Sequence, residues 1–222
     1  MPTALILGAS RGIGRELVRQ YLADGWRVIA SARRQADCDS LAAMGAAPQL
    51  LDVTDAASIA ALGWQRDGVQ LDVAIVNAGV FGPRHDSVPT EAEFDAVMHT
   101  NVLAAMRLLP LVAPLVYAQR GKVAVLSSRM GSIGARSSAS ATLYRASKAA
   151  LNSVLMDASI VHGPQGAVCV AFHPGWVRTD MGGAGADLDV ADSVAGLRAT
   201  LAGLTPAANG SFLDYDGTPI PW

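Results

Sequence analysis

The fold of this chain is decided by its first stretch, Thr3-Ala4-Leu5-Ile6-Leu7-Gly8-Ala9-Ser10-Arg11-Gly12-Ile13-Gly14. The run Thr3–Leu7 is predicted as a buried strand, and the loop after it leads into a helix predicted for Ile13–Ala23. Glycines there permit a tight turn and a close approach of the backbone to a diphosphate, which the N–H groups at the helix N-terminus bind. The spacing is G-x-x-x-G-x-G rather than G-x-G-x-x-G. The stretch therefore predicts a dinucleotide site, with an ordinary glycine turn as the alternative.

Short apolar runs alternate with longer amphipathic stretches over the rest of the chain. The predicted strands are Thr3–Leu7, Arg27–Ser31, Pro48–Asp52, Val73–Asn77, Lys122–Ser127, Ala167–Phe172 and Ser211–Asp214. The predicted helices are Ile13–Ala23, Ala56–Leu62, Glu91–Tyr117, Tyr144–His162 and Val190–Leu201. We expect Pro110 and Pro114 to kink or break the third of these helices. Apolar strands separated by helices indicate a parallel sheet covered on both faces, so we predict a single Rossmann-type, doubly wound α/β domain over residues 1–222, with about seven strands.

Composition and charge exclude several classes of protein. Hydrophobic residues make up 51% of the 222 and charged residues 16%, which excludes disorder. The net charge is −2 without a basic run, so no nucleic-acid or membrane partner is expected, and no apolar run reaches the roughly 18 residues of a membrane span. Pro2–Gly8 is typical of a strand rather than a signal peptide, and a cytoplasmic location is expected, where Cys38 and Cys169 stay reduced. No metal site is expected, because metal-ligand spacing is absent among the histidines His85, His99, His162 and His173.

The end of the second predicted strand bears on the choice between NAD and NADP. An acidic residue there would bind the ribose hydroxyls of NAD and repel a 2′-phosphate. This chain instead has Ala32 followed by Arg33 and Arg34, and Arg11 in the glycine loop can approach the same place. Guanidinium groups are strong charge-assisted partners of phosphate. NADP(H) is therefore the preferred cofactor and NAD(H) the alternative, unless these arginines are only solvated surface residues.

Two further strand ends are candidate nucleotide contacts. Asp52 and Val53 end the third predicted strand and are placed to reach the adenine, while Asn77-Ala78-Gly79 ends the fourth beside the ribose. Without the rest of the pattern, both could equally be turn residues at the ends of strands.

The stretch Tyr144-Arg145-Ala146-Ser147-Lys148 pairs a potential acid with a cation. In a helix, Tyr144 and Lys148 are four residues apart and share one face. A free phenol has a pKa of about 10, and a cation about 4 Å away would lower it by roughly three units. That range suits general acid–base catalysis. A surface helix with an exposed lysine is the alternative for this pair taken alone.

These motifs occur along the chain in one characteristic order. The order is the glycine loop, Asp52, Asn77-Ala78-Gly79, Asn101, Ser128, Tyr144 and Lys148, His173-Pro174-Gly175 and Thr179. In this order the chain resembles the short-chain dehydrogenase/reductase family over nearly its whole length. The segments around Ser127-Ser128, Tyr144–Lys148 and His173–Val177, and the ending Asp214–Trp222, resemble the C-factor and Sniffer-type carbonyl reductases, which have a short substrate lid.

The resemblance implies a catalytic tetrad. Ser128 would hold the substrate carbonyl oxygen and Tyr144 would donate the proton to it. Lys148 would bind the nicotinamide ribose and lower the pKa of the phenol, and Asn101 would fix a water that links Lys148 to solvent. Ser127 is the rival to Ser128, because adjacent strand residues face opposite sides and one of the two must point away.

The resemblance also extends the cofactor site to the turn Pro174-Gly175, which would orient the nicotinamide, and to Val177 and Thr179 near its carboxamide. The complete set of expected cofactor-binding residues is Gly8, Ser10, Arg11, Gly12, Ile13, Gly14, Arg33, Asp52, Val53, Asn77, Ala78, Gly79, Tyr144, Lys148, Pro174, Gly175, Val177 and Thr179.

The expected function is an NADPH-dependent reductase that converts an aldehyde, ketone or quinone to an alcohol. A cofactor-binding signalling or scaffold protein of the C-factor type is the alternative, and isomerase, dehydratase or epimerase chemistry is a third hypothesis. A small-molecule substrate and a homodimer or homotetramer, formed through Glu91–Tyr117 and Tyr144–His162, are expected.

Two loops set expectations for the substrate pocket. Tyr144 follows Ser128 by more residues than is usual in the family, so the loop Ser132–Ala141 must bulge. The lid after Asp180 is short, which predicts an open pocket. Its loop Met181–Asp189 offers no charged anchor beyond Asp187 and Asp189, which disfavours an anionic substrate group there.

Overall fold

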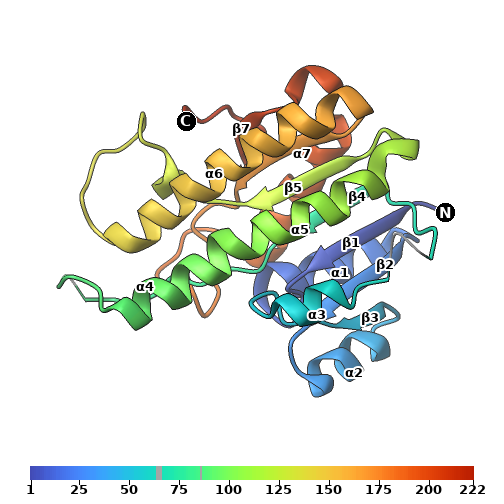
Figure 1. Cartoon of the computed structure of the whole chain (residues 1–222), viewed down its shortest axis with the longest axis horizontal. Helices are drawn as coiled ribbons and strands as arrows, with labels where there is room; N and C mark the ends of the chain where they lie inside the picture. The colour runs from blue at the N-terminus through green and yellow to red at the C-terminus, as the bar shows by residue number, and fades with distance from the viewer. Residues whose placement is uncertain (64–66, 86) are drawn as a thin grey trace.

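The computed structural model describes residues 1–63, 67–85 and 87–222, and it contains a seven-stranded sheet in the order β3-β2-β1-β4-β5-β6-β7 (Figure 1). Every neighbouring pair of strands is parallel. The strands are β1 Thr3–Leu7, β2 Arg27–Ala32, β3 Ala47–Leu50, β4 Val73–Val76, β5 Lys122–Leu126, β6 Val168–His173 and β7 Ser211–Asp214. The strand order reverses between β1 and β4, and in such sheets ligands bind at this switch point, beyond the carboxyl ends of the strands.

Helices cover both faces of the sheet, as the predicted fold class requires. The α-helices are α1 Gly12–Ala23, α2 Gln35–Ala43, α3 Ala56–Ala60, α4 Glu91–Met98, α5 Ala104–Val112, α6 Thr142–His162 and α7 Val190–Gly203. The shorter helical segments are η1 His99–Leu103, η2 Ala113–Gln119, η3 Arg129–Gly131, η4 Gly163–Gln165 and η5 Pro206–Ala208. The Rossmann-type α/β fold is therefore confirmed, and the predicted strand and helix ends differ from the observed ones by at most a few residues.

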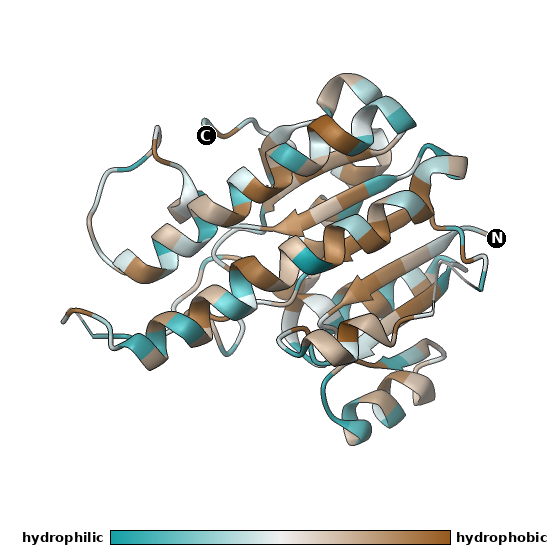
Figure 2. Cartoon of the chain, viewed as in Figure 1, coloured by the Kyte–Doolittle hydropathy of each residue, from teal (hydrophilic) through white to brown (hydrophobic). Residues whose placement is uncertain are grey.

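The two faces of the sheet bury two separate hydrophobic clusters. Leu5 and Leu7 of β1 pack with α3, α5 and α6, whereas Ala4 and Ile6 pack with α1, α2 and α7. This division follows the alternation of side chains along a strand. Figure 2 shows the strands as mostly hydrophobic, which is typical of a parallel sheet covered on both sides.

Helix α2 was not predicted from the sequence. It buries only Cys38 and Leu41, so its apolar pattern is too sparse to indicate a helix. Its first turn contains Asp37, which accepts hydrogen bonds from Arg34 just before the helix.

The predicted long helix Glu91–Tyr117 is divided into four segments. The α-helical backbone ends at Val112 and η2 begins at Ala113, directly before Pro114, so the expected break is confirmed there, whereas Pro110 lies inside α5. The sequence did not indicate η1, a π-helical turn between α4 and α5. Such turns are frequent at functional sites.

The stretch Glu91–Gln119 also corrects an expectation about membranes. By length and composition alone it qualifies as a membrane-crossing helix, although no such segment was expected from the sequence. The most apolar part of it is 56% buried inside the protein. Leu108, Leu109 and Val112 pack against the sheet, as expected of the core helix of a globular protein.

Replacing Gly14 tests the close packing of α1 on the sheet. A Cβ at Gly14 would lie 2.2 Å from the Gly8 carbonyl oxygen and 2.5 Å from Asn77 Nδ2. Gly14→Ala is therefore expected to lower the free energy of unfolding by about 1–3 kcal/mol, measured by urea denaturation. Gly203→Ala is the control, because no atom lies within 4 Å of a Cβ at this helical glycine. Equal stability of the two variants would contradict the packing argument.

Candidate active site

The glycine loop takes a backbone conformation that only glycine adopts easily. Gly8 and Gly12 have φ angles of +88° and +52°. A Cβ on Gly8 would also lie 2.8 Å from the Cα of Ala78, at the end of β4. The side chain of Asn77 donates a hydrogen bond to the Gly8 carbonyl oxygen. Asn77 and Ala78 therefore help to hold the glycine loop in its conformation. Because its glycines have no side chains, the loop exposes bare backbone next to the N-terminus of α1.

The arginines near the expected 2′-phosphate are not equivalent. Arg34 forms an ion pair with Asp37 at 2.8 Å, and Arg11 forms one with Asp180 at 2.7 Å. Arg33 has no ion pair within the described residues. Of these three arginines, Arg33 is therefore the one that is not paired with a carboxylate of the described residues.

Asp52 at the end of β3 is held by its own turn. Its Oδ1 accepts hydrogen bonds from the backbone N of Thr54 at 2.9 Å and from the Thr54 hydroxyl at 2.7 Å. The Thr54 hydroxyl, with smaller contributions from the Thr54 backbone and from Arg33, lowers the pKa of this carboxyl below its usual value. The carboxylate is thereby fixed in orientation at the edge of the expected adenine site.

Lys148 is buried at the centre of the candidate site. Its side chain leaves α6 and its Nζ donates a hydrogen bond to the Leu126 carbonyl oxygen at 2.7 Å. A Cβ placed on Gly79 would lie 3.3 Å from both Lys148 Nζ and Asn101 Oδ1, so these two groups meet above the end of β4. The exposed-lysine alternative for the Tyr144–Lys148 pair is therefore wrong, because only 4% of Lys148 is exposed.

Asn101 projects from the π-helical turn η1 and is fully engaged with its neighbours. Its amide nitrogen donates to the Val80 carbonyl at 2.8 Å and to Ser147 Oγ at 2.9 Å. Its Oδ1 accepts from the Val80 backbone N at 2.8 Å. The side chain thus ties the loop after β4 to α6, one residue away from Lys148.

The two serines at the end of β5 point in different directions. Ser127 Oγ donates to the side chain of Asn152 beneath α6. Ser128 Oγ accepts a hydrogen bond from the Met130 backbone N at 3.2 Å, and its side chain is hydrogen-bonded with Tyr144. Of the two, Ser128 is the one that lies beside the phenol.

The protonation of Tyr144 differs from the expectation. Burial raises the pKa of Tyr144 to about 12, although its hydrogen bond with Ser128 acts in the opposite direction. Burial also lowers the pKa of Lys148 to about 8. The lysine does not lower the phenol pKa here because its Nζ lies 5.7 Å from the tyrosine ring centroid and bonds to Leu126. The expected lowering is therefore corrected, and desolvation is the larger effect.

A cavity of about 540 Å³ is lined by the predicted nicotinamide residues and by two of the four predicted catalytic residues, but not by Asn101 or Lys148. Ser128 and Tyr144 line one part of it, and the turn residues Pro174, Gly175, Val177 and Thr179 line another. Phe81 and Trp176 also line the cavity. The Phe81 ring stacks on Tyr144 with centroids 4.6 Å apart, and the Arg84 guanidinium lies 4.9 Å from the Phe81 centroid.

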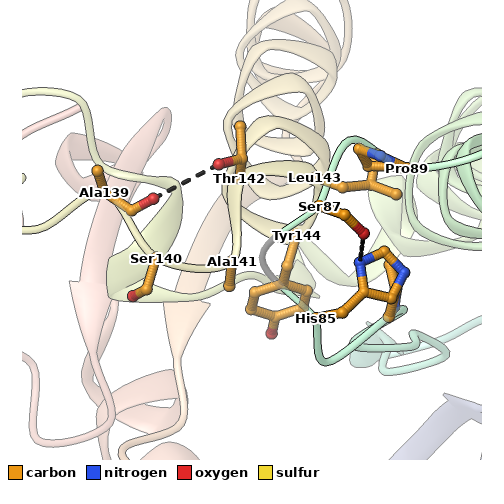
Figure 3. Close-up of a pocket in the computed structure, with 10 residues that line it drawn as sticks. His85, Ser87, Pro89, Ala139, Ser140, Ala141, Thr142, Leu143 and Tyr144 are labelled. Atoms are coloured by element: carbon orange, nitrogen blue, oxygen red, sulfur yellow. Dashed lines mark hydrogen bonds between the residues drawn. The ribbon is translucent and has the colours of Figure 1, made fainter.

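Tyr144 also borders a smaller cavity of about 300 Å³, shown in Figure 3. Its walls come from the loop after β4 and from the loop that precedes α6. His85 and Ser87 form one side, with Ser87 Oγ 2.7 Å from His85 Nδ1. Thr142 closes the other side and donates to the Ala139 carbonyl oxygen at 3.4 Å. The phenol therefore lies between two cavities at the carboxyl edge of the sheet.

Several lining residues of the large cavity were not identified from the sequence as site residues. They include Arg84, Arg129, Met130 and Arg145. Arg145 was within the Tyr144–Lys148 motif, and its position beside Tyr144 was the available signal. Arg84 lies in the loop after β4 and Met130 in η3, and the conformation of these segments brings both to the cavity.

Comparison with known proteins agrees with this geometry. The chain matches the family described as short chain dehydrogenase over residues 2–187. It is 41% identical to the C-signal protein of Myxococcus xanthus over 154 residues, which cover 68% of this chain and 93% of that protein.

Solved structures give the same result over the whole chain. The carbonyl reductase Sniffer of D. melanogaster superimposes with a TM-score of 0.90 at 28% identity, covering 100% of both chains. The NADPH-bound carbonyl reductase from chicken fatty liver has a TM-score of 0.90 at 31% identity, covering 100% of this chain and 99% of that one. The chain therefore belongs to the short-chain dehydrogenase/reductase family of oxidoreductases, within which it resembles the C-factor and Sniffer-type members.

Proposed function

We propose that this protein reduces an aldehyde, ketone or quinone to the alcohol with hydride from NADPH, and that Tyr144 is the proton donor. The observation that carries the proposal is the convergence of the Ser128 hydroxyl and the Tyr144 phenol on one cavity that the turn Pro174-Gly175 also lines. The relatives described as carbonyl reductases, one of them bound to NADPH, support it.

The residues present fit NADP(H). The bare backbone of the glycine loop leaves space that a Cβ would fill, and the N-terminus of α1 supplies N–H groups for a diphosphate. The uncommitted guanidinium of Arg33 provides a partner for a 2′-phosphate. When bound, the cofactor supplies the hydride, and the protein supplies binding, orientation and electrostatics.

The protein groups act on the carbonyl oxygen. This oxygen gains negative charge as the carbonyl carbon is reduced, so donors aimed at it stabilise the transition state more than the ground state. The Ser128 hydroxyl holds the oxygen, and Tyr144 transfers its proton to it. A phenol with a pKa of about 12 is protonated at neutral pH and is ready to donate. Lys148, buried beside these groups, would hold the nicotinamide ribose of the cofactor.

Exposed apolar side chains support the formation of a homo-oligomer through Glu91–Tyr117 and Tyr144–His162, the segments named from the sequence. Met106 on α5 is 51% exposed, and Ile160 and Val161 on α6 are 66% and 62% exposed. Exposed apolar side chains on these helices suit an interface between copies of the chain.

A cofactor-binding signalling or scaffold protein is the second candidate function. The 41% identity to the C-signal protein favours it. A binder that does not turn over has no need for a buried Lys148 beside Tyr144 and Ser128, so the reductase is the preferred proposal.

Removing the Tyr144 hydroxyl separates these two functions. Tyr144→Phe is expected to lower kcat for aldehydes, ketones and quinones by about 10²–10⁴-fold, because the proton donor is lost. NADPH oxidation measures the rate, and fluorescence titration shows whether the cofactor still binds. Tyr117→Phe is the matched control, since Tyr117 bonds to His162 away from the cavity. Wild-type protein that binds NADPH without reducing any substrate would favour the signalling function.

Arg33→Gln tests the proposed 2′-phosphate contact. The variant is expected to weaken NADPH binding by about tenfold or more, while NADH binding changes little, because only NADPH carries the 2′-phosphate. Arg34→Gln is the matched control and should have a smaller effect, since Arg34 is already paired with Asp37. An equal loss of affinity for both cofactors in Arg33→Gln would contradict the assignment. Titration calorimetry with each cofactor makes the comparison.

Lys148→Met tests the cost of burying the ammonium. Below pH 8 the lysine is charged in both the folded and the unfolded chain, and its lowered pKa corresponds to a cost on the order of 3 kcal/mol. The variant is expected to unfold at higher urea concentration at neutral pH while losing turnover. The stability advantage of the variant over wild type should shrink between pH 8 and 10.5, because in this range Lys148 of the wild-type protein is charged only in the unfolded chain. A constant difference across this range would show that the lysine is not desolvated.

A further inference from the structure

The guanidinium of Arg145 is buried without a carboxylate partner. Only 7% of this residue is exposed. Its Nε donates to the Ser140 carbonyl oxygen and its Nη2 to Ser138 Oγ, each at 2.7 Å, and its Nη1 lies 3.4 Å from the Met130 carbonyl oxygen. All three acceptors are neutral, and no ion pair to Arg145 is found among residues 1–63, 67–85 and 87–222. Buried charged groups in proteins are usually paired with an opposite charge. Among the described residues, Arg145 has no such partner.

The cavity that Arg145 lines carries positive charge. Its lining includes three arginines, Arg84, Arg129 and Arg145, and no aspartate or glutamate among the described residues. Arg129 is paired with Asp214. Arg84 lies over the Phe81 ring and donates to the Met181 carbonyl oxygen at 2.7 Å. Among the described residues, Arg84 and Arg145 therefore line the cavity without forming an ion pair to a carboxylate.

Arg145 is also close to the proposed proton donors. It follows Tyr144 directly in α6. Its Nη1 approaches the carbonyl of Met130, whose backbone N bonds to Ser128 Oγ. This side of the cavity differs from the glycine loop, whose N–H groups suit the cofactor diphosphate. An anion held by Arg145 would belong to the molecule whose carbonyl lies between Ser128 and Tyr144.

We propose that the carbonyl substrate carries a carboxylate and that Arg145 is its anchor. The planar guanidinium matches the two oxygens of a carboxylate, and the anion would complete the charge balance of the buried arginine. The inference rests on the proposed reductase function and names its substrate class. The expectation that an anionic group is disfavoured at the loop Met181–Asp189 does not apply to the Arg145 side of the cavity, because neither Asp187 nor Asp189 lines the cavity, and Asp189 is paired with Arg178.

The test compares two substrates that differ in one charge, 4-carboxybenzaldehyde and its neutral methyl ester. Wild-type protein is expected to reduce the carboxylate with a kcat/KM about tenfold or more above that of the ester. Arg145→Gln should abolish this preference, mainly through a higher KM for the carboxylate, and Arg145→Lys should restore part of it. The ratio of kcat/KM for the two substrates is the decisive measurement, because distortion of the site by either variant affects both substrates and cancels in this ratio.

Arg136→Gln is the matched control, since Arg136 is an exposed arginine of the loop that precedes α6 and does not line the cavity. It should keep the wild-type ratio. If Arg145→Gln does not fold, competition by benzoate and benzamide against the ester in wild-type protein gives the same comparison, with benzoate expected to inhibit more strongly. Equal reduction of both aldehydes, or equal inhibition, would overturn the carboxylate anchor while leaving the reductase intact. Failure to reduce any carbonyl compound would overturn the proposed function, and the anchor with it.

Discussion

The burial of the Lys148 ammonium is the constraint on which the site depends. A charged amine is held in the interior by the Leu126 carbonyl oxygen, and the surrounding elements are shaped to make room for it. Gly79 leaves space for Nζ, and a Cβ at Gly131 would lie 2.8 Å from the Lys148 side chain. The π-helical turn η1 brings Asn101 to the same place, where it bonds to α6. Gly79 and Gly131 thus leave room for Lys148, and the π-helical turn η1 places Asn101 beside it.

Desolvation gives this site its electrostatic character. The same burial that keeps the phenol of Tyr144 protonated brings the pKa of Lys148 near neutrality. Both groups lie in positions that are unfavourable for their charged forms. For Lys148, which is charged at neutral pH, this is a cost to stability of the kind that active sites commonly carry. Arg145, the residue after Tyr144 in α6, is a further buried cation, and its acceptors among the described residues are neutral.

The cavity is closed by contacts that join loops distant in sequence. Arg11 from the glycine loop pairs with Asp180, and Arg84 from the loop after β4 donates to the neighbouring Met181 carbonyl. The segment that follows Thr179 is therefore held from both sides. The parallel sheet makes this possible, because the carboxyl ends of β1, β4 and β6 meet at one edge and their loops converge there (Figure 1).

The sequence by itself determined the fold and most of the candidate site residues. Glycine spacing after a strand, apolar strands between helices, and the Tyr144–Lys148 interval each have a local physical meaning that does not depend on distant contacts. Only the tertiary structure decided which of Ser127 and Ser128 lies beside the phenol, that Arg33 alone of its pair is uncommitted, and that Tyr144 keeps its proton. It also decided that three arginines line the large cavity. These properties depend on burial and on partners far along the chain, and neither is encoded in the spacing of residues.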